Sequence, residues 1–156
     1  MNTIAPTRPT QLHVCRVRLP AGPIAAPEAR SQIRAVISAW HVPVDPGVAV
    51  LLTSELVTNA LRQEPGETVT LAITCSCAQL RIDVHDTSRL LPVLVEAPAD
   101  AEAGRGLMLV ASLSDQWGAY LTPAGKAVYF TLAFQPDLDQ GGRRGPRGFT
   151  RGDGEP

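Results

Sequence analysis

The sequence holds little that would direct the chain to nucleic acid, to a membrane or to secretion. Lysine is nearly absent, Lys126 being the only one, and the net charge of −1 offers no basic field for nucleic acid or an anionic membrane. No apolar run approaches the roughly 20 residues of a membrane span, and residues 1–10 lack the charged-then-apolar order of a secretory signal. We therefore expect a cytoplasmic protein without a direct nucleic-acid or membrane partner.

Cysteine is also scarce, and the three cysteines do not suggest a disulfide framework. Cys75 and Cys77 fall on the same face of a predicted strand, where the simplest interpretation is a pair of small buried hydrophobic side chains. A metal site that recruits His85 is the alternative, but a C-x-C pair with one distant histidine lacks the four ligands of a closed zinc site. We assign no function to the cysteines.

Hydrophobic residues make up 44% of the chain, which is enough for a packed core, and 156 residues suit one compact domain with tails. Residues 1–10 are polar and contain prolines, so they predict a flexible N-terminal tail. Residues 136–156 are rich in glycine, arginine and aspartate, and they predict a flexible C-terminal tail. The folded domain is therefore expected over residues 11–135.

Hydrophobic periodicity predicts the order strand, helix, helix, strand, strand, loop, helix, strand, strand. The expected strands are 12–19, 67–75, 80–86, 116–122 and 126–134; the expected helices follow Pro27, run from about 46 to 63 after an Asp45 N-cap, and begin at the glycines near 104. Helices grouped beside adjacent strands favour an α+β fold, a two-layer sandwich with a mixed, mainly antiparallel sheet.

The helix predicted over residues 46–63 carries two polar residues in an unusual place. Glu55 and Asn59 fall within the aliphatic stripe that begins with Val48 and Leu52. A carboxylate and a carboxamide on a core-facing surface are costly unless a partner satisfies them. The pair is therefore predicted either to hydrogen-bond neighbouring backbone or to face a polar ligand.

Two further clusters could face the same ligand. Asp86 ends a predicted strand where a long loop, residues 87–103, begins; it is either a turn residue or an acceptor for an exocyclic amine such as that of adenine. The block Gly104–Leu107 then opens a helix. Glycines allow close approach of a ligand, and a helix N-terminus favours phosphate, although a loop-to-helix junction has the same appearance.

These residue types suit the chemistry of a metal–nucleotide complex. Mg²⁺ takes oxygen ligands and usually few protein groups beside the phosphates, so the carboxamide oxygen of Asn59 is a candidate ligand. A positioned carboxylate such as Glu55 orients or deprotonates the attacking nucleophile in phosphoryl transfer.

Four ordered blocks, E-L-V-T-N-A, V-H-D-T-S, G-R-G-L and P-A-G-K-A-V-Y-F, resemble the GHKL (Bergerat-fold) ATPases. The resemblance covers about residues 12–134 and is closest to the bacterial anti-sigma-factor serine/threonine kinases and their small stand-alone histidine-kinase-like relatives. It implies a Bergerat-type sandwich with ATP and Mg²⁺ as cofactors. It also implies roles for individual residues: Glu55 as the catalytic base, Asn59 as the Mg²⁺ ligand, Asp86 as the adenine acceptor, Gly104, Arg105, Gly106 and Leu107 at the phosphates, and Thr131 near the adenine side.

The resemblance implies an ATP-binding regulator similar to an anti-sigma factor. Such a protein phosphorylates a serine or threonine of a STAS-like antagonist protein, exchanges that partner with a sigma factor, and often forms a homodimer. The loop at 87–103 is expected to be the ATP lid, as its length alone suggests.

The alternative is a non-catalytic partner-binding module with a degenerate or purely structural nucleotide site. Thr87 and Ser88 follow Asp86 where the wider superfamily has the glycines of D-x-G-x-G, and their presence favours this module. A third interpretation, an unrelated α/β domain whose motifs match by chance, would require that no nucleotide binds.

Overall fold

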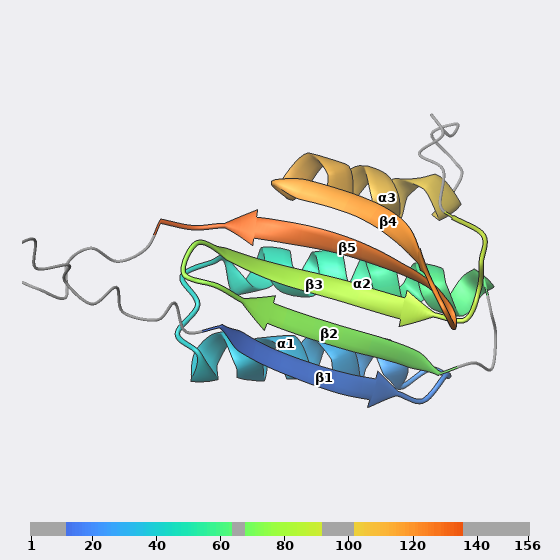
Figure 1. Cartoon of the computed structure of the whole chain (residues 1–156), viewed down its shortest axis with the longest axis horizontal. Helices are drawn as coiled ribbons and strands as arrows, with labels where there is room; N and C mark the ends of the chain where they lie inside the picture. The colour runs from blue at the N-terminus through green and yellow to red at the C-terminus, as the bar shows by residue number, and fades with distance from the viewer. Residues whose placement is uncertain (1–11, 64–67, 92–101, 136–156) are drawn as a thin grey trace, which may run out of the picture.

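The chain folds with its helices packed on one face of an antiparallel sheet, as the computed structural model shows for residues 12–63, 68–91 and 102–135 (Figure 1). The predicted tails at 1–10 and 136–156 lie outside the described residues. Most of the loop predicted to be a lid also lies outside them, since only residues 87–91 and 102–103 of it are described.

The described residues form five strands and three helices in the predicted order. They are β1 (His13–Leu19), α1 (Ala25–Ala39), α2 (Pro46–Gln63), β2 (Val69–Cys75), β3 (Gln79–Asp86), α3 (Glu102–Leu113), β4 (Gln116–Thr122) and β5 (Gly125–Ala133). The first helix begins two residues before Pro27 rather than at it. Proline is tolerated there because amides of the first helical turn have no intrahelical acceptor.

The strand order in the sheet is β1-β2-β3-β5-β4, and all four pairings are antiparallel. The predicted two-layer α+β sandwich is confirmed, while the parallel pairing that a mixed sheet would need is absent from the described strands. Two helices separate β1 from β2, so the chain returns to the end where β1 finished and runs back antiparallel. Strands β3 and β4 share a direction, but β5 lies between them.

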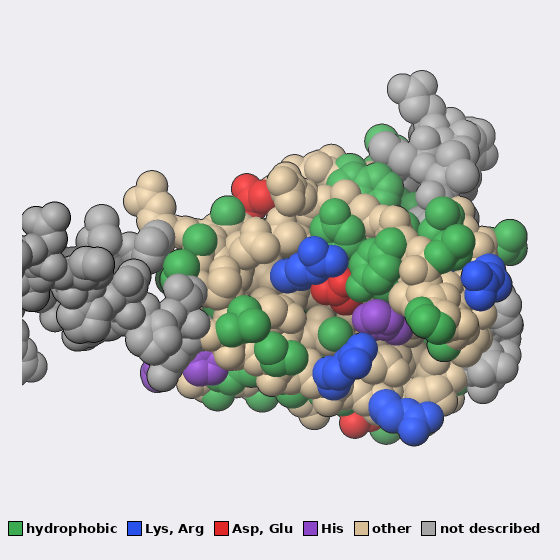
Figure 2. All heavy atoms as spheres, viewed as in Figure 1, with side chains coloured by type: hydrophobic (Ala, Val, Ile, Leu, Met, Phe, Trp, Pro, Cys, Tyr) green, Lys and Arg blue, Asp and Glu red, His purple; other side chains and the backbone are tan. Residues whose placement is uncertain are grey.

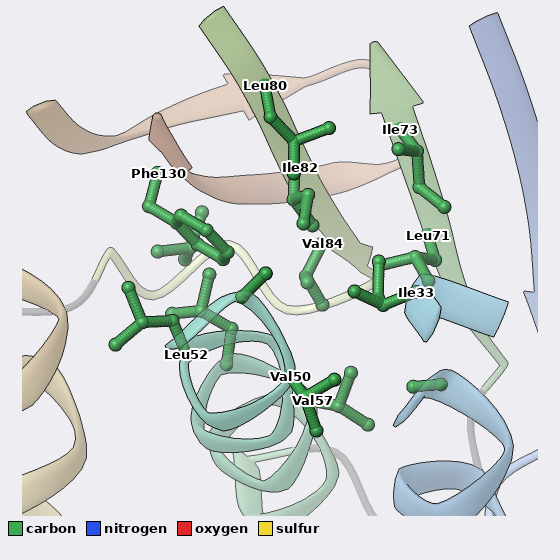
Figure 3. Close-up of a cluster of buried hydrophobic side chains, with 14 of the residues drawn as sticks. Ile33, Val50, Leu52, Val57, Leu71, Ile73, Leu80, Ile82, Val84 and Phe130 are labelled. Atoms are coloured by element: carbon green, nitrogen blue, oxygen red, sulfur yellow. The ribbon is translucent and has the colours of Figure 1, made fainter. Parts of the chain in front are cut away.

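The hydrophobic core fills the space between the sheet and the helices. Strand residues of period two, such as Val84 on β3 and Phe130 on β5, point toward Ile33 of α1 and Leu52 of α2 (Figure 3). Phe130, Ile33 and Leu52 are all completely buried. Each side chain of this kind contributes roughly 1.5–3 kcal/mol relative to an exposed position, which holds the helices firmly against this face.

Helix α2 lies between the other two helices and is the element that positions the candidate site. Its start is the predicted one, because Asp45 Oδ1 accepts hydrogen bonds from the amides of Gly47 (2.8 Å) and Val48 (3.4 Å). On one side, Ser54 Oγ accepts a hydrogen bond of 3.0 Å from Arg30 of α1. The opposite side of α2 therefore faces α3.

The prediction for Cys77 is wrong, whereas Cys75 is buried as expected at the end of β2. Cys77 is exposed in the turn between β2 and β3. Ser76 Oγ accepts hydrogen bonds from the amides of Ala78 and Gln79, and this tight turn ends the strand before Cys77.

Candidate functional site

Glu55 and Asn59 lie at the flank of the buried stripe of α2, not within it. The centre of the stripe is formed by Ala49, Leu56 and Ala60, whereas Glu55 and Asn59 are half-buried. Within the described part of the chain, neither side chain makes a hydrogen bond or an ion pair. The interpretation in which both residues only satisfy neighbouring backbone is therefore not supported, and both polar groups remain available to a ligand.

The side chain of Glu55 rests directly against Gly106 of α3. A Cβ atom added at Gly106 would lie 2.6 Å from Glu55 Oε2, which is closer than non-bonded atoms approach. Any larger residue at 106 would displace the carboxylate. The glycine thus provides the room that Glu55 occupies, and the fold joins two clusters that lie about 50 residues apart in the sequence.

The glycine block lies inside α3, because the helix begins at Glu102. Gly104 and Arg105 belong to the first turn, whose amides lack intrahelical acceptors and favour an anion. Gly106 follows that turn, so its contribution is close approach rather than a free amide. Leu107 is buried in the core, where it anchors the helix rather than presenting a polar group.

Asp86 is buried at the end of β3 and already has partners. Its Oδ1 accepts hydrogen bonds from the amide of Ser88 (2.9 Å) and from Lys126 Nζ (3.2 Å). Oδ2 lies 3.1 Å from the same Nζ but accepts no hydrogen bond of good geometry from the described residues. Asp86 therefore forms a turn with Ser88, as one of the two interpretations of the sequence predicted. Its Oδ2 accepts no hydrogen bond from the described residues, and it is the atom that the other interpretation would use to bind an exocyclic amine.

Lys126 was not identified from the sequence, although it is completely buried and pairs with Asp86 across β3 and β5. The alternation of residues along β5 could have identified it. Lys126 continues the period-two series of Val128, Phe130 and Leu132, so it has to point toward the helices. A lysine in such a position is almost never fully buried without a partner of opposite charge.

Thr131 does not join the other candidate residues, and its predicted approach to the adenine side is not supported by the geometry. It alternates with the core residues Phe130 and Leu132, so its side chain belongs to the opposite face of the sheet. It also lies five residues along β5 from Lys126, a separation of about 17 Å. A threonine on the last strand resembles the family pattern whichever face of the sheet its side chain lies on, so the resemblance alone could not predict its orientation.

The arrangement is suited to holding a metal–nucleotide complex rather than a bare metal ion. Among the described residues, no group of three or more histidine, cysteine, aspartate or glutamate side chains could hold a metal ion. Mg²⁺ bound at Asn59 would therefore take its remaining oxygen ligands from phosphates and water. Glu55, which has no partner among the described residues, and the space that Gly106 leaves beside it fit such a ligand, as does Asp86 Oδ2, which is ion-paired with Lys126 but accepts no hydrogen bond.

Comparisons with known proteins agree with this geometry. The family model of the histidine kinase-like ATPase domain matches residues 19–132, a range that includes Glu55, Asn59, Asp86 and the glycine block. A search of curated proteins found no match. Within the described residues, no helix is both long enough and apolar enough to cross a membrane. The chain belongs to the histidine kinase-like ATPase domain family, which supports an ATP-binding regulatory role.

Proposed function

We propose that this chain is an ATP-dependent protein kinase that phosphorylates a serine or threonine of an antagonist protein and so regulates a sigma factor. The observation that carries the proposal is the carboxylate of Glu55, which lies against Gly106 one helical turn from the carboxamide of Asn59, both without a partner among the described residues. At a half-buried position such groups are open to water or to a ligand, and a ligand that replaces the water has to satisfy them.

Each residue has a separate task in this proposal. Glu55 orients the hydroxyl nucleophile and accepts its proton. Asn59 supplies a carboxamide oxygen to Mg²⁺, which neutralises phosphate charge when it is bound. The first-turn amides of α3, at Gly104 and Arg105, donate to the phosphates. Asp86 Oδ2 accepts a hydrogen bond from the exocyclic amine of the base.

The proposed partners are a sigma factor and a STAS-like antagonist, and the proposed assembly is a homodimer. Their support is the resemblance of the four sequence blocks to anti-sigma-factor kinases. Phosphorylation of the antagonist would weaken its complex with this chain and return the chain to the sigma factor.

The kinase proposal is tested by transfer of the γ-phosphoryl group from ATP to STAS-like antagonist proteins. Glu55→Gln keeps the size and the hydrogen-bonding capacity of the side chain but cannot take a proton. We expect this variant to bind Mg–ATP and to lose transfer by about 10²- to 10⁴-fold, the usual contribution of a general base. Transfer at the native rate by Glu55→Gln would refute the role of the carboxylate.

The second candidate is a non-catalytic module that binds a partner and uses nucleotide only as a structural ligand. The ion pair between Asp86 and Lys126 favours it, because the base-recognising carboxylate has only one acceptor atom left. Such a module would bind Mg–ATP without transferring or releasing phosphate, and the native chain and Glu55→Gln would behave alike in both assays.

A further inference from the structure

The face of the sheet that carries no helix contains a depression of about 440 Å³. Arginine and histidine side chains gather on this face in Figure 2. Its lining includes Arg16 and Arg18 of β1, Thr70 of β2, His85 and Asp86 of β3, and Thr122 at the end of β4. Glu55 and Asn59 do not line it, since α2 packs on the other face of the sheet.

The strand register brings the polar groups of this depression into one row. Arg18 of β1 pairs with Thr70 of β2, which in turn pairs with His85 of β3. Neighbouring strands lie about 4.8 Å apart, so the three side chains stand next to one another. Arg16 lies two residues from Arg18 on the same face, about 7 Å along the strand. Both guanidinium groups can therefore reach a single small ligand.

Among the residues that the structure describes, the charged groups around the depression leave an excess of positive charge. The two described carboxylates nearby are already paired: Arg81 donates to both oxygens of Asp83 at 2.9 and 3.0 Å, and Lys126 pairs with Asp86. Arg16 and Arg18 are exposed and have no ion-pair partner in the described part of the chain. Two unbalanced guanidinium groups beside threonine hydroxyls are the donor set that a phosphate group requires.

Protection of the sheet edge is an alternative explanation of these two arginines, but it explains fewer of the features of the depression. Strand β1 is an edge of the sheet, and charged side chains on edge strands discourage pairing with other chains. That task needs charge along the edge alone. It does not need a concavity in which the hydroxyls of Thr70 and Thr122, from two other parts of the sheet, accompany the arginines.

We propose that this depression binds the phosphate monoester group of a ligand, with Arg16 and Arg18 as the charged donors. The site lies on the face of the sheet opposite Glu55 and Asn59, has only Asp86 in common with the proposed ATP site, and does not depend on the proposed kinase activity. The shared chemistry is a phosphate dianion, which either a phosphorylated serine side chain or free inorganic phosphate can supply.

His85 provides a direct reporter at the end of the row. Burial lowers the pKa of its imidazole; the Asp83 carboxylate acts in the opposite direction, Arg16 lowers the pKa further and Asp86 raises it. The ring of Tyr120 packs against it edge-on with 6.3 Å between centroids. A phosphate dianion in the depression would stabilise the imidazolium and raise the pKa of His85.

The test is an NMR titration of the His85 imidazole in the full chain, against inorganic phosphate and against a phosphoserine peptide at constant ionic strength. We expect the pKa of His85 to rise with either ligand in a saturable way. Arg16→Ala and Arg18→Ala should each weaken binding about tenfold or more, whereas Arg34→Ala, an exposed arginine on α1, should bind normally.

The two ligands distinguish the source of the phosphate group. Tighter binding of the peptide than of its unphosphorylated form and of inorganic phosphate identifies a phosphorylated side chain as the ligand; equal binding of peptide and phosphate identifies the free anion. No saturable change at His85, or an unchanged response in the Arg16→Ala/Arg18→Ala double variant, would overturn the proposal. Because both arginines are exposed, these variants should fold like the native chain.

Discussion

The buried ion pair between Lys126 and Asp86 leads to the sharpest stability prediction. Replacing Lys126 with methionine keeps most of the apolar stem but removes the ammonium group that lies 3.1 Å from Asp86 Oδ2. Asp86 is only 5% exposed, so its carboxylate then stays buried, with the amide of Ser88 as its remaining partner among the described residues. Breaking a buried pair by removing one partner costs about 3–5 kcal/mol.

That loss is a large share of the roughly 5–15 kcal/mol by which small domains are stable, so the variant should unfold at much lower urea concentration. The double variant Lys126→Met/Asp86→Asn removes both charges and keeps an acceptor for Ser88. We expect it to recover most of the lost stability, because no uncompensated charge remains.

Urea unfolding followed by circular dichroism and by the fluorescence of Trp40 and Trp117, both partly buried against the core, measures all four members of this cycle. The reasoning predicts a coupling free energy of several kcal/mol between positions 86 and 126. It would be refuted if Lys126→Met cost less than about 1 kcal/mol, or if the two single losses simply added in the double variant.

Three more predictions concern single positions. Gly106→Ala displaces only the flexible end of Glu55, so it should stabilise α3 by about 0.5–1 kcal/mol yet weaken Mg–ATP binding or phosphoryl transfer; unchanged function would show that Glu55 needs no glycine beside it. Gly125→Ala, by contrast, would drive a Cβ into the backbone of Asp86 and Thr87, which cannot rotate away, and should cost at least about 2 kcal/mol; a urea midpoint equal to that of Gly106→Ala would contradict this. Because the folded-state pKa of His85 is lowered, the unfolded chain binds the proton first as the pH falls through about 6.5, and folding stability should drop there. His85→Gln should remove that part of the pH dependence, and equal slopes in both proteins between pH 5 and 7 would contradict the assignment.

Local patterns predicted the elements and much of the candidate site. The Asp45–Pro46 pair predicted the start of α2 because capping acts within one turn of chain, and the hydrogen bonds to Gly47 and Val48 confirm it. Helical spacing likewise placed Glu55 and Asn59 on one side of α2. It could not show that this side faces Gly106, since the approach of α2 and α3 depends on packing.

The missed features depend on pairing between distant strands. The contact of Lys126 with Asp86 follows from the register of β3 and β5, which join positions 40 residues apart. The same register places Thr131 on the face opposite the helices. Reading β5 with its period of two, from buried Phe130 in both directions, would have identified both orientations before any contact was known.

The most direct test of the central claim is calorimetric titration of ATP, with and without Mg²⁺, into the native chain and into Asn59→Ala. Thr58→Ala is the matched control, because Thr58 is also half-buried on α2 but points away from Asn59 around the helix. The account predicts ATP binding that depends on Mg²⁺, weakens by roughly tenfold or more in Asn59→Ala and is retained in Thr58→Ala. Absence of binding to the native chain, or equal Mg²⁺-dependent affinity in all three proteins, would contradict it.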